Sequence, residues 1–262
     1  MRRTLLALLF TLALATDAIA AEGVNLRWNA CLGDGGTLNR NFACDTNTGS
    51  EQLFVSFEVD SSIADISGMD CNLWLATPVG APGPWWQFKN VGACRRDALT
   101  LAAANPAPGG ACMDWAPGVV GATVAVITNY GGGASTLTRL MFTMGSPAPV
   151  TLEPGHEYFA MRLTISHAKT VGTGACGGCS APACLGVEGI YLNGSGGSRH
   201  DVATETRYQS SVASWQESSP SSYFVHTTGM YPYQNRDLRM LECAAAVPAR
   251  NRTWGTLKSL YY

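Results

Sequence analysis

Charged side chains are scarce in this sequence. Asp, Glu, Lys and Arg together make up 14% of the 262 residues, against roughly a quarter in an average domain, and the formal net charge is −2. A basic surface of the kind that binds nucleic acid is therefore not expected. Solubility must come from neutral polar side chains and exposed backbone.

Complete catalytic signatures are absent as well. The sequence contains neither the Gly-x-Ser-x-Gly turn of serine hydrolases nor the Gly-Lys-Ser/Thr loop that cradles phosphates. His156-Glu157 begins like a metalloprotease helix, but Ala160 stands where the second histidine belongs. The four histidines are scattered, so a Ser/His/Asp triad gains no local support.

A long apolar run is also missing. Residues 5–15 form an apolar stretch of about eleven residues, shorter than the roughly twenty that a membrane helix needs. Arg2 and Arg3 precede this stretch, and Ala18-Ile19-Ala20 follows it, which is the order of a cleavable secretory signal. We expect cleavage after Ala20, no transmembrane segment afterwards, and a secreted product in the periplasm, at the cell surface or outside the cell; an uncleaved anchor helix is the alternative.

The mature region shows the period-two pattern of strands. In 53–60 and in 159–166, apolar residues alternate with mostly polar ones, which predicts two half-buried strands. In the second strand, Phe159 and Met161 are expected on the core face. Weaker strand candidates are 26–29, 71–77, 86–91, 119–128, 136–144, 187–192 and 223–227, with a weakly held strand around 208–215.

Gly, Pro, Asn and Asp clusters separate these segments, and no helical stripe of ten or more residues appears. We therefore predict an all-β, antiparallel β-sandwich of the immunoglobulin-like or jelly-roll type, with long Gly/Pro-rich loops. Its expected organisation is a signal peptide at 1–20, one secreted domain at 21–247 and a tail at 248–262. In the tail, Trp254, Leu257 and Leu260 are spaced as in a short helix.

One short stretch carries a family resemblance. Leu152-Glu-Pro-Gly-His-Glu-Tyr158, which leads into an alternating strand, resembles the turn and tyrosine corner of fibronectin type III and other immunoglobulin-like domains. The resemblance implies that the Tyr158 hydroxyl bonds back to the backbone of the corner. The cysteine-rich layout also looks like uncharacterised secreted β-sandwich proteins of bacteria, a resemblance that implies no activity.

The cysteines predict cross-links. Nine are present in the mature region, and in an oxidising compartment such a density indicates disulfides with at least one thiol left over. Short loops favour Cys31 with Cys44 and Cys94 with Cys112, and one bond within the 176–184 cluster or from that cluster to Cys71. The disulfide candidates are Cys31, Cys44, Cys71, Cys94, Cys112, Cys176, Cys179 and Cys184.

The motif Cys176-Gly-Gly-Cys179, with Cys184 after it, has two further readings. A redox role would need a helix N-terminus in a thioredoxin-like frame, which the sequence does not show. A zinc site would need ligands such as His167 or His200. Structural disulfides are favoured, because export leads to an oxidising compartment.

Two other sets of residues are candidate binding sites. Asp45 and Asn47 lie in a run of oxygen-bearing side chains that is typical of calcium loops, although the EF-hand spacing fails and an Asx turn explains the run equally well. Trp85 and Trp86 follow a proline-rich stretch and, on a strand, would point at least one indole outward toward a glycan or a protein. The alternative places Trp86 in the core and Trp85 at its rim.

Taken together, these features favour an exported, non-catalytic binding or structural β-sandwich protein of the bacterial envelope or the extracellular space. Its partner would be a protein or a glycan, and no cofactor is predicted beyond the calcium and zinc alternatives. One rival function is a secreted hydrolase that acts on polysaccharide through two converging carboxylates. The other is a metal- or redox-active cysteine cluster.

Overall fold

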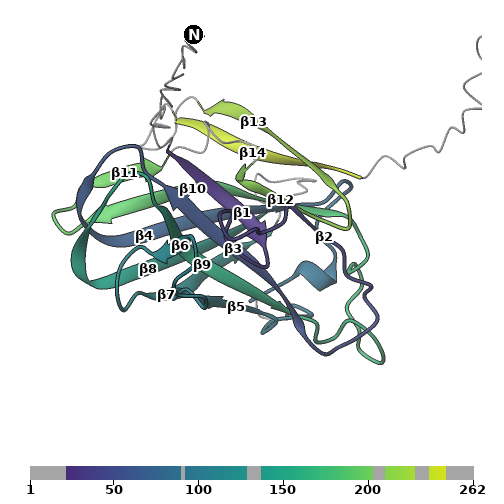
Figure 1. The fold of residues 1–262 in the computed structure, drawn as a ribbon. Helices are drawn as coiled ribbons and strands as arrows, with labels where there is room; N and C mark the ends of the chain where they lie inside the picture. The colour runs from purple at the N-terminus through teal and green to yellow at the C-terminus, as the bar shows by residue number, and fades with distance from the viewer. Residues whose placement is uncertain (1–21, 90–91, 129–136, 203–209, 228–235, 246–262) are drawn as a thin grey trace, which may run out of the picture.

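The structure is a computed structural model, and it describes residues 22–89, 92–128, 137–202, 210–227 and 236–245. Two sheets face each other, and a separate β-hairpin lies at the side of the molecule formed by β10 and β12 (Figure 1). No helix in these ranges is long and apolar enough to span a membrane. The predicted signal peptide and the predicted tail helix lie outside the described residues.

The smaller sheet has five strands. Its order is β1-β3-β9-β5, with antiparallel neighbours throughout, and the short β6 pairs with β9 in parallel. Its strands are β1 (Gly23–Trp28), β3 (Ser50–Glu58), β5 (Leu99–Ala102), β6 (Cys112–Asp114) and β9 (Glu157–Ser166).

The larger sheet has seven strands in the order β2-β12-β10-β4-β8-β7, with β11 paired to the far end of β10. All pairs are antiparallel except β2 with β12. Its strands are β2 (Asn39–Arg40), β4 (Ile63–Ala76), β7 (Val120–Ile127), β8 (Leu137–Leu152), β10 (Ala183–Gly194), β11 (Arg199–Val202) and β12 (Val212–Trp215).

The hairpin of β13 (Ser219–Thr227) and β14 (Arg236–Ala244) packs on the outer surface of the larger sheet, against β10 and β4. The disulfide Cys184–Cys243 joins it to β10. Leu241 lies over Gly186, where a Cβ atom would stand only 3.1 Å from the leucine side chain. The hairpin therefore has both a packed contact and a covalent one with the body.

One continuous apolar core fills the space between the sheets, as the sandwich prediction required. Leu53, Val55 and Phe57 of β3 contribute to it from one side, and Leu73 and Leu75 of β4 from the other. All five side chains are fully buried. The structure thus confirms an all-β sandwich with antiparallel pairing and cysteine cross-links.

Most predicted strands are found, but one is not. Of the segment predicted at 86–91, residue 86 ends a 3-10 turn, η1 (Pro84–Trp86), residues 87–89 form no strand, and residues 90–91 lie outside the described residues. Pro84 fixes the backbone for such a turn at its first position, and the Gln87 N–H closes the turn onto the Pro84 carbonyl. Local proline geometry therefore overrides the apolar pattern there.

A β-bulge at Ala160 changes which side chains of β9 face the core. The register with β3 shifts at this residue, so that Tyr158 pairs with Phe57 on the core face and Phe159 pairs with Ser56 on the outer face. The prediction that Phe159 shares the core face with Met161 is therefore wrong. Phe159 packs outside the sheet against Phe54, whose ring centroid is 6.0 Å away.

Four disulfides connect distant parts of the chain, and all nine cysteines lie in described residues. The predicted pairs Cys31 with Cys44 and Cys94 with Cys112 are wrong, and so is a bond within 176–184 or to Cys71. The observed pairs are Cys31–Cys112, Cys44–Cys179, Cys94–Cys176 and Cys184–Cys243, and Cys71 is a buried free thiol. Sequence separations of 59 to 135 residues reflect strand order in the sandwich.

Candidate functional site

Trp85 and Trp86 lie in the core and offer no face to a ligand. Their exposed fractions are 0% and 1%, so the prediction of an outward-pointing indole is wrong. Trp85 stacks on Trp215 at 5.2 Å, and the Arg95 guanidinium lies 3.7 Å from the Trp85 ring on its way to the backbone carbonyl of Trp85. Burial lowers the pKa of Arg95 to about 10, so that it remains charged at neutral pH.

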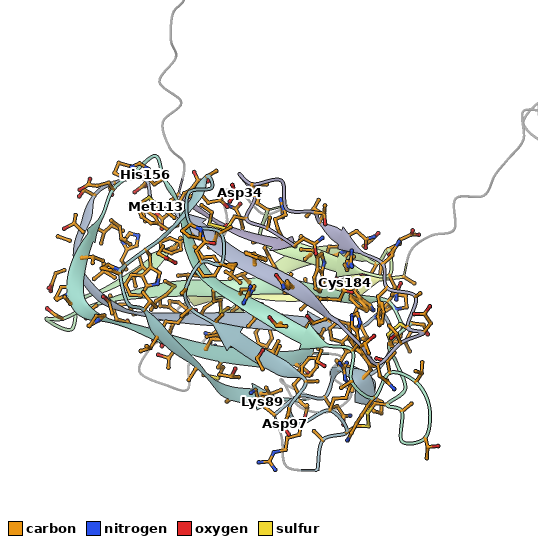
Figure 2. All side chains as sticks on the ribbon, turned by 60° about the horizontal axis from the view of Figure 1, so that its bottom comes forward. Asp34, Lys89, Asp97, Met113, His156 and Cys184 are labelled. Atoms are coloured by element: carbon orange, nitrogen blue, oxygen red, sulfur yellow. A yellow bond between two sulfur atoms is a disulfide. The ribbon has the colours of Figure 1, made fainter. Side chains whose placement is uncertain are left out.

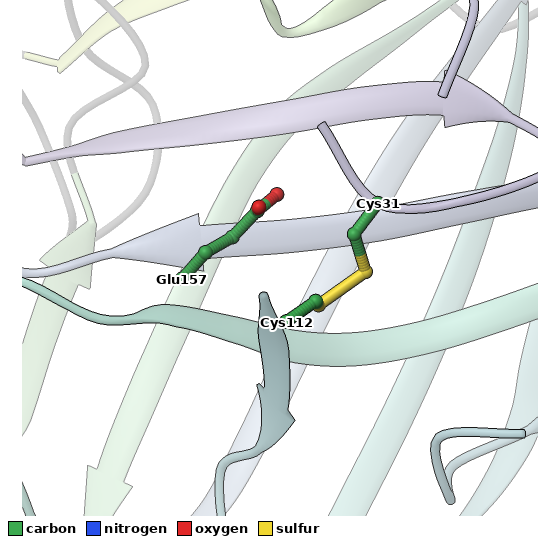
Figure 3. Close-up of side chains that lie close together, drawn as sticks. All are labelled: Cys31, Cys112 and Glu157. Carbon is green, nitrogen blue, oxygen red and sulfur yellow. A yellow bond between two sulfur atoms is a disulfide. The ribbon is translucent and has the colours of Figure 1, made fainter. Parts of the chain in front are cut away.

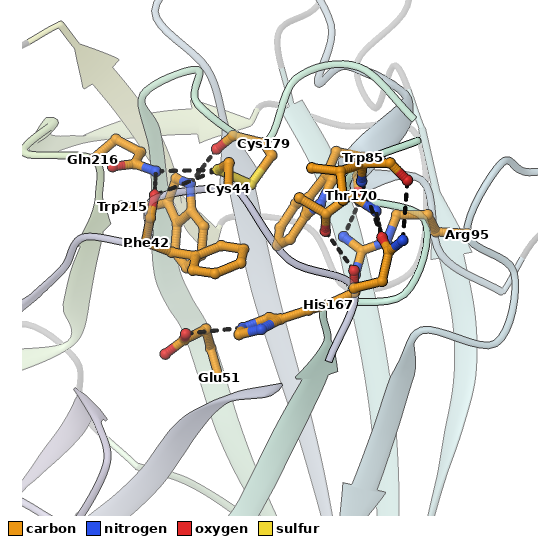
Figure 4. Close-up of a disulfide and its surroundings, with 12 residues drawn as sticks. Phe42, Cys44, Glu51, Trp85, Arg95, His167, Thr170, Cys179, Trp215 and Gln216 are labelled. Carbon is orange, nitrogen blue, oxygen red and sulfur yellow. Dashed lines mark hydrogen bonds and ion pairs between the residues drawn. A yellow bond between two sulfur atoms is a disulfide. The ribbon is translucent and has the colours of Figure 1, made fainter. Parts of the chain in front are cut away.

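A His–Glu pair lies beside this aromatic cluster (Figure 4). His167 Nε2 is 2.9 Å from Glu51 Oε1, Nδ1 is 2.7 Å from the Thr48 carbonyl, and the ring stacks on Phe42 at 3.8 Å. Glu51 also bonds Arg40. Because both ring nitrogens already have partners and neither partner is a hydroxyl or a thiol, the pair holds segment 40–49 against the sheet and activates no nucleophile.

The predicted calcium ligands do not form a loop around a cation. Asp45 is exposed, and the side-chain oxygen of Asn47 accepts two backbone N–H groups, from Thr170 at 2.7 Å and Val171 at 3.0 Å. These bonds use both acceptor positions of that oxygen. Asn47 therefore clamps two loops together, in place of the local Asx turn that the sequence favoured.

The cysteine cluster is dispersed among three partners. Cys176, Cys179 and Cys184 bond to Cys94, Cys44 and Cys243 respectively, so none of them offers the thiolate that a zinc site or a redox dithiol needs. Figure 4 shows the Cys44–Cys179 bond next to the tryptophan cluster. Both cysteines of the Cys176-Gly-Gly-Cys179 motif therefore form structural disulfides.

In the described part of the chain, one group of three ligand-type side chains lies close enough to share an ion: Cys31, Cys112 and Glu157 (Figure 3). The two cysteines are bonded to each other. The Glu157 carboxylate accepts the backbone N–H groups of Leu32 at 3.0 Å and Gly33 at 2.7 Å, together with the Ser56 hydroxyl. The group therefore fastens loop 29–37 to the outer side of the smaller sheet.

Tyr158 occupies the corner that the local resemblance implied. Its hydroxyl donates to the Glu153 carbonyl at 3.0 Å and accepts from the Glu153 N–H at 2.8 Å. The neighbouring His156 is exposed and lies with Asp34 and Met113 at one end of the sandwich, away from Lys89 and Asp97 (Figure 2). Both hydrogen bonds of the Tyr158 hydroxyl go to the Glu153 backbone, so the role of this residue is to hold the turn.

The outer face of the larger sheet is only partly covered. Part of it lies under the hairpin, where Leu241 and Cys243 cover Trp74 and Val212. The rest carries two zones with different chemistry. Thr143 is exposed on β8, where it pairs with Asp70 of β4 on one side and Ala122 of β7 on the other.

The first zone is a row of polar contacts, which we call the polar row. Arg139 reaches from β8 across β4 and donates two hydrogen bonds, of 2.8 and 2.9 Å, to the two carboxylate oxygens of Glu188. The Arg199 guanidinium lies 3.9 Å over the Tyr191 ring and pairs with Asp201 at 2.8 Å. Charges of both signs therefore alternate along this part of the face.

Burial shapes the acid–base behaviour of the polar row. It raises the pKa of Glu188, and the charge and hydrogen bonds of Arg139 oppose that shift. Burial also raises the pKa of Tyr191, with a further contribution from the Glu188 charge. Because both Glu188 oxygens accept bonds from Arg139, this carboxyl group is placed for an ion pair and not for proton donation to a substrate.

The second zone is the apolar row, formed by the outward side chains of β7. A bulge between Thr123 and Ala125 shifts the register with β8, so that Ala125 and Ile127 face the same side as Val120 and Ala122. Val120 is 72% exposed and Ile127 is 40% exposed. Sequence alternation could not reveal this row, because a strict period of two places 125 and 127 opposite 120 and 122.

Aromatic side chains offer little for sugar stacking in the described residues. Every described Trp and Phe ring is buried or packed against a neighbouring ring. Tyr191 is covered on one side by Arg199 and on the other lies over Gly189, where a Cβ atom would be 2.9 Å from the ring. The outer face can therefore offer polar edges and aliphatic surface, but no open aromatic platform among these side chains.

The fold and its cross-links define this chain as a disulfide-bonded all-β sandwich with a β-hairpin that a disulfide links to the larger sheet. No protein-family model matches the sequence, and no curated protein is significantly similar to it. A solved structure with partial similarity is the cohesin module from a Clostridium perfringens family 33 glycoside hydrolase, at 7% identity and a TM-score of 0.33, over 74% of this chain and 93% of the module. Similarity at that level supports no argument about function.

Proposed function

We propose that this chain is an exported, non-catalytic binding protein that contacts a protein partner through the outer face of its seven-stranded sheet. Export is supported by the order of charges and apolar residues before Ala20 and by four disulfides, which form and persist in oxidising compartments. The cell envelope or the extracellular space provides such a compartment.

The observation that carries the proposal is the pairing of the polar row with the apolar row on one sheet face. Protein interfaces combine an aliphatic or aromatic centre with charged pairs that fix orientation. On the outer side of the smaller sheet, by contrast, the apolar side chains Cys31, Phe54 and Phe159 are buried in a cluster with Cys112 of β6. A protein partner is favoured over a glycan because the described aromatic rings are covered.

The test uses the exported protein as bait against the secreted and envelope proteins of its source. Thr143→Arg places a large charge at the centre of the outer face, where the native side chain is exposed, so the fold is expected to persist. Thr100→Arg on β5 is the matched control, since Thr100 is equally exposed on the smaller sheet. We expect Thr143→Arg to lose a partner that the wild type and the control retain.

Two results would contradict this proposal. One is a partner that binds Thr143→Arg and the wild type with equal affinity, which places the contact elsewhere on the molecule. The other is a glycan, identified on an array with the purified protein, that competes with the captured protein. Circular dichroism of each variant checks that the sandwich is intact.

A further inference from the structure

Strand β7 ends the seven-stranded sheet with an open edge. It pairs with β8 on one side, and no described strand pairs with it on the other. In Figure 1 it lies on the side of the molecule opposite the hairpin. The N–H and C=O groups along such an edge form a template for another strand.

Natural edge strands usually carry devices that prevent such pairing, above all charged side chains. Here residues 115–138 contain no Asp, Glu, Lys, Arg or His, so the whole strand and its flanks are uncharged. The bulge after Thr123 is the one protective feature on β7, and it turns Ala125 and Ile127 outward to complete the apolar row. Exposed aliphatic surface and an unpaired backbone edge therefore coincide.

The side chains of β7 are also complementary to a second copy of the same strand. When two copies of β7 run antiparallel across a twofold axis, the Val120 end of one meets the Ile127 end of the other, so the two exposed large aliphatic side chains of this strand lie together. Neither strand brings a charge that repels its copy, and the net charge of the whole chain is only −2. A charged partner strand would find no counter-charge along this edge.

We propose that β7 is a self-association edge, where two copies of this chain pair their seven-stranded sheets antiparallel into one continuous sheet. The inference stands on the β7 edge and is separate from the partner proposed above. Main-chain hydrogen bonds would supply the affinity, and the apolar rows of the two copies would adjoin on the outer face. The polar row and the hairpin would remain accessible.

The test is sedimentation equilibrium of the exported full chain from about 1 µM to about 1 mM, the range in which weak protein pairs assemble. We expect the mass to double across this range and the amides of Val120–Ile127 to gain hydrogen-exchange protection in the dimer. Ala122→Lys puts a charge in the middle of the apolar row and should keep the chain monomeric. Val79→Lys is the control, because Val79 is 87% exposed in the loop that follows β4 and the variant adds the same charge outside β7.

Two outcomes would overturn the proposal: a monomer at every concentration, or a dimer in which Ala122→Lys changes nothing and the β7 amides gain no protection. Circular dichroism and the melting temperature of Ala122→Lys establish that any monomer is folded. If that variant unfolds, Val120→Lys at the exposed end of the strand replaces it. Failure of the partner-capture test with Thr143→Arg has no bearing on these readouts.

Discussion

Six tryptophans fall within the described residues, and each of them is at most 3% exposed. Three of them, Trp85, Trp86 and Trp215, meet at one end of the core with ring centroids 4.9 to 5.4 Å apart. Large flat rings bury much apolar area at little entropic cost, which suits a sandwich end that is otherwise made of loops. Arg95 closes the cluster through backbone carbonyls and the Trp85 ring.

Replacement of a cluster member should therefore cost stability. For Trp85→Ala we expect a loss of roughly 3 to 5 kcal/mol in the free energy of unfolding, because the cavity cannot refill and Arg95 loses its stacking partner. Trp85→Phe should recover part of that loss. Urea unfolding followed by circular dichroism measures both variants, and a Trp85→Ala protein as stable as the wild type would show that the cluster is not core.

The tyrosine corner gives a second prediction at this scale. Tyr158→Phe removes both hydrogen bonds to the Glu153 backbone while it keeps the ring that packs on Phe57. We expect a loss of about 1 to 3 kcal/mol, since two part-buried hydrogen bonds are lost and each contributes roughly 0.5 to 1.5 kcal/mol. His156→Ala, at an exposed position two residues earlier, should cost far less in the same unfolding measurement, and equal losses would contradict the role assigned to the hydroxyl.

Glu188 gives a prediction about pH. Its pKa is raised by burial above the ordinary 4.5, against the opposing effect of Arg139, so the folded chain holds a proton that the unfolded chain has already released. The contribution of Glu188 to the unfolding free energy must then fall as the pH rises above 4.5. Glu188→Gln removes this titration, so the stability of the wild type relative to the variant should decline as the pH rises above 4.5 and through the raised pKa of Glu188.

Urea unfolding of both proteins at several pH values measures that difference. A difference that grows with pH would mean that the two hydrogen bonds from Arg139 outweigh burial. Glu242→Gln, an exposed position on β14, is the control and should show no comparable trend.

At the scale of elements, most of the strands could be predicted, but the faces of the bulged strands β7 and β9 could not. The alternating segments around β3 and β9 are found where the pattern placed them. The bulge at Ala160 in β9 and the bulge after Thr123 in β7 each interrupt the alternation of their strand. One extra residue puts the side chains on its two sides out of phase, so they no longer follow a period of two. Phe159 and the apolar row were therefore placed by the structure alone.

The prediction of the disulfide pairs was wrong for a related reason. Short sequence separation favoured Cys31 with Cys44, but a sandwich brings together residues of strands and loops that are far apart in sequence. Cys44 thus bonds to Cys179 across the end of the molecule, at a separation of 135 residues. The Tyr158 corner could be predicted because its contacts are local, whereas the pair of Arg139 with Glu188 needs the order of three strands.

The hairpin gives the prediction for this scale. Cys184→Ser combined with Cys243→Ser removes its covalent tie, so we expect β14 amides to exchange faster and the free energy of unfolding to fall by about 2 to 4 kcal/mol. Cys94→Ser with Cys176→Ser is the matched control, which should lower stability but leave β14 protected. If β14 exchange is the same in both double variants, the latch role of the Cys184–Cys243 bond is wrong.

At the scale of the whole molecule, the cross-links and the predicted leader indicate the same compartment. The sequence has only 14% charged residues and contains 29 glycines, which lose more conformational freedom on folding than other residues. Disulfides that close loops of tens of residues restrict the unfolded chain strongly, which offsets part of that cost. Such bonds form and persist in oxidising compartments, and the proposed export would deliver the chain to one.

The most direct test of this account is peptide mapping of the purified exported protein without reduction, after alkylation in denaturant. We predict an N-terminus at Ala21, four linked peptide pairs that match the observed bonds, and one alkylated thiol at Cys71. Because burial raises the pKa of Cys71 and hides it from reagents, no alkylation is expected before denaturation. A product that begins at Met1 with its cysteines reduced would contradict both the export and the cross-linked fold.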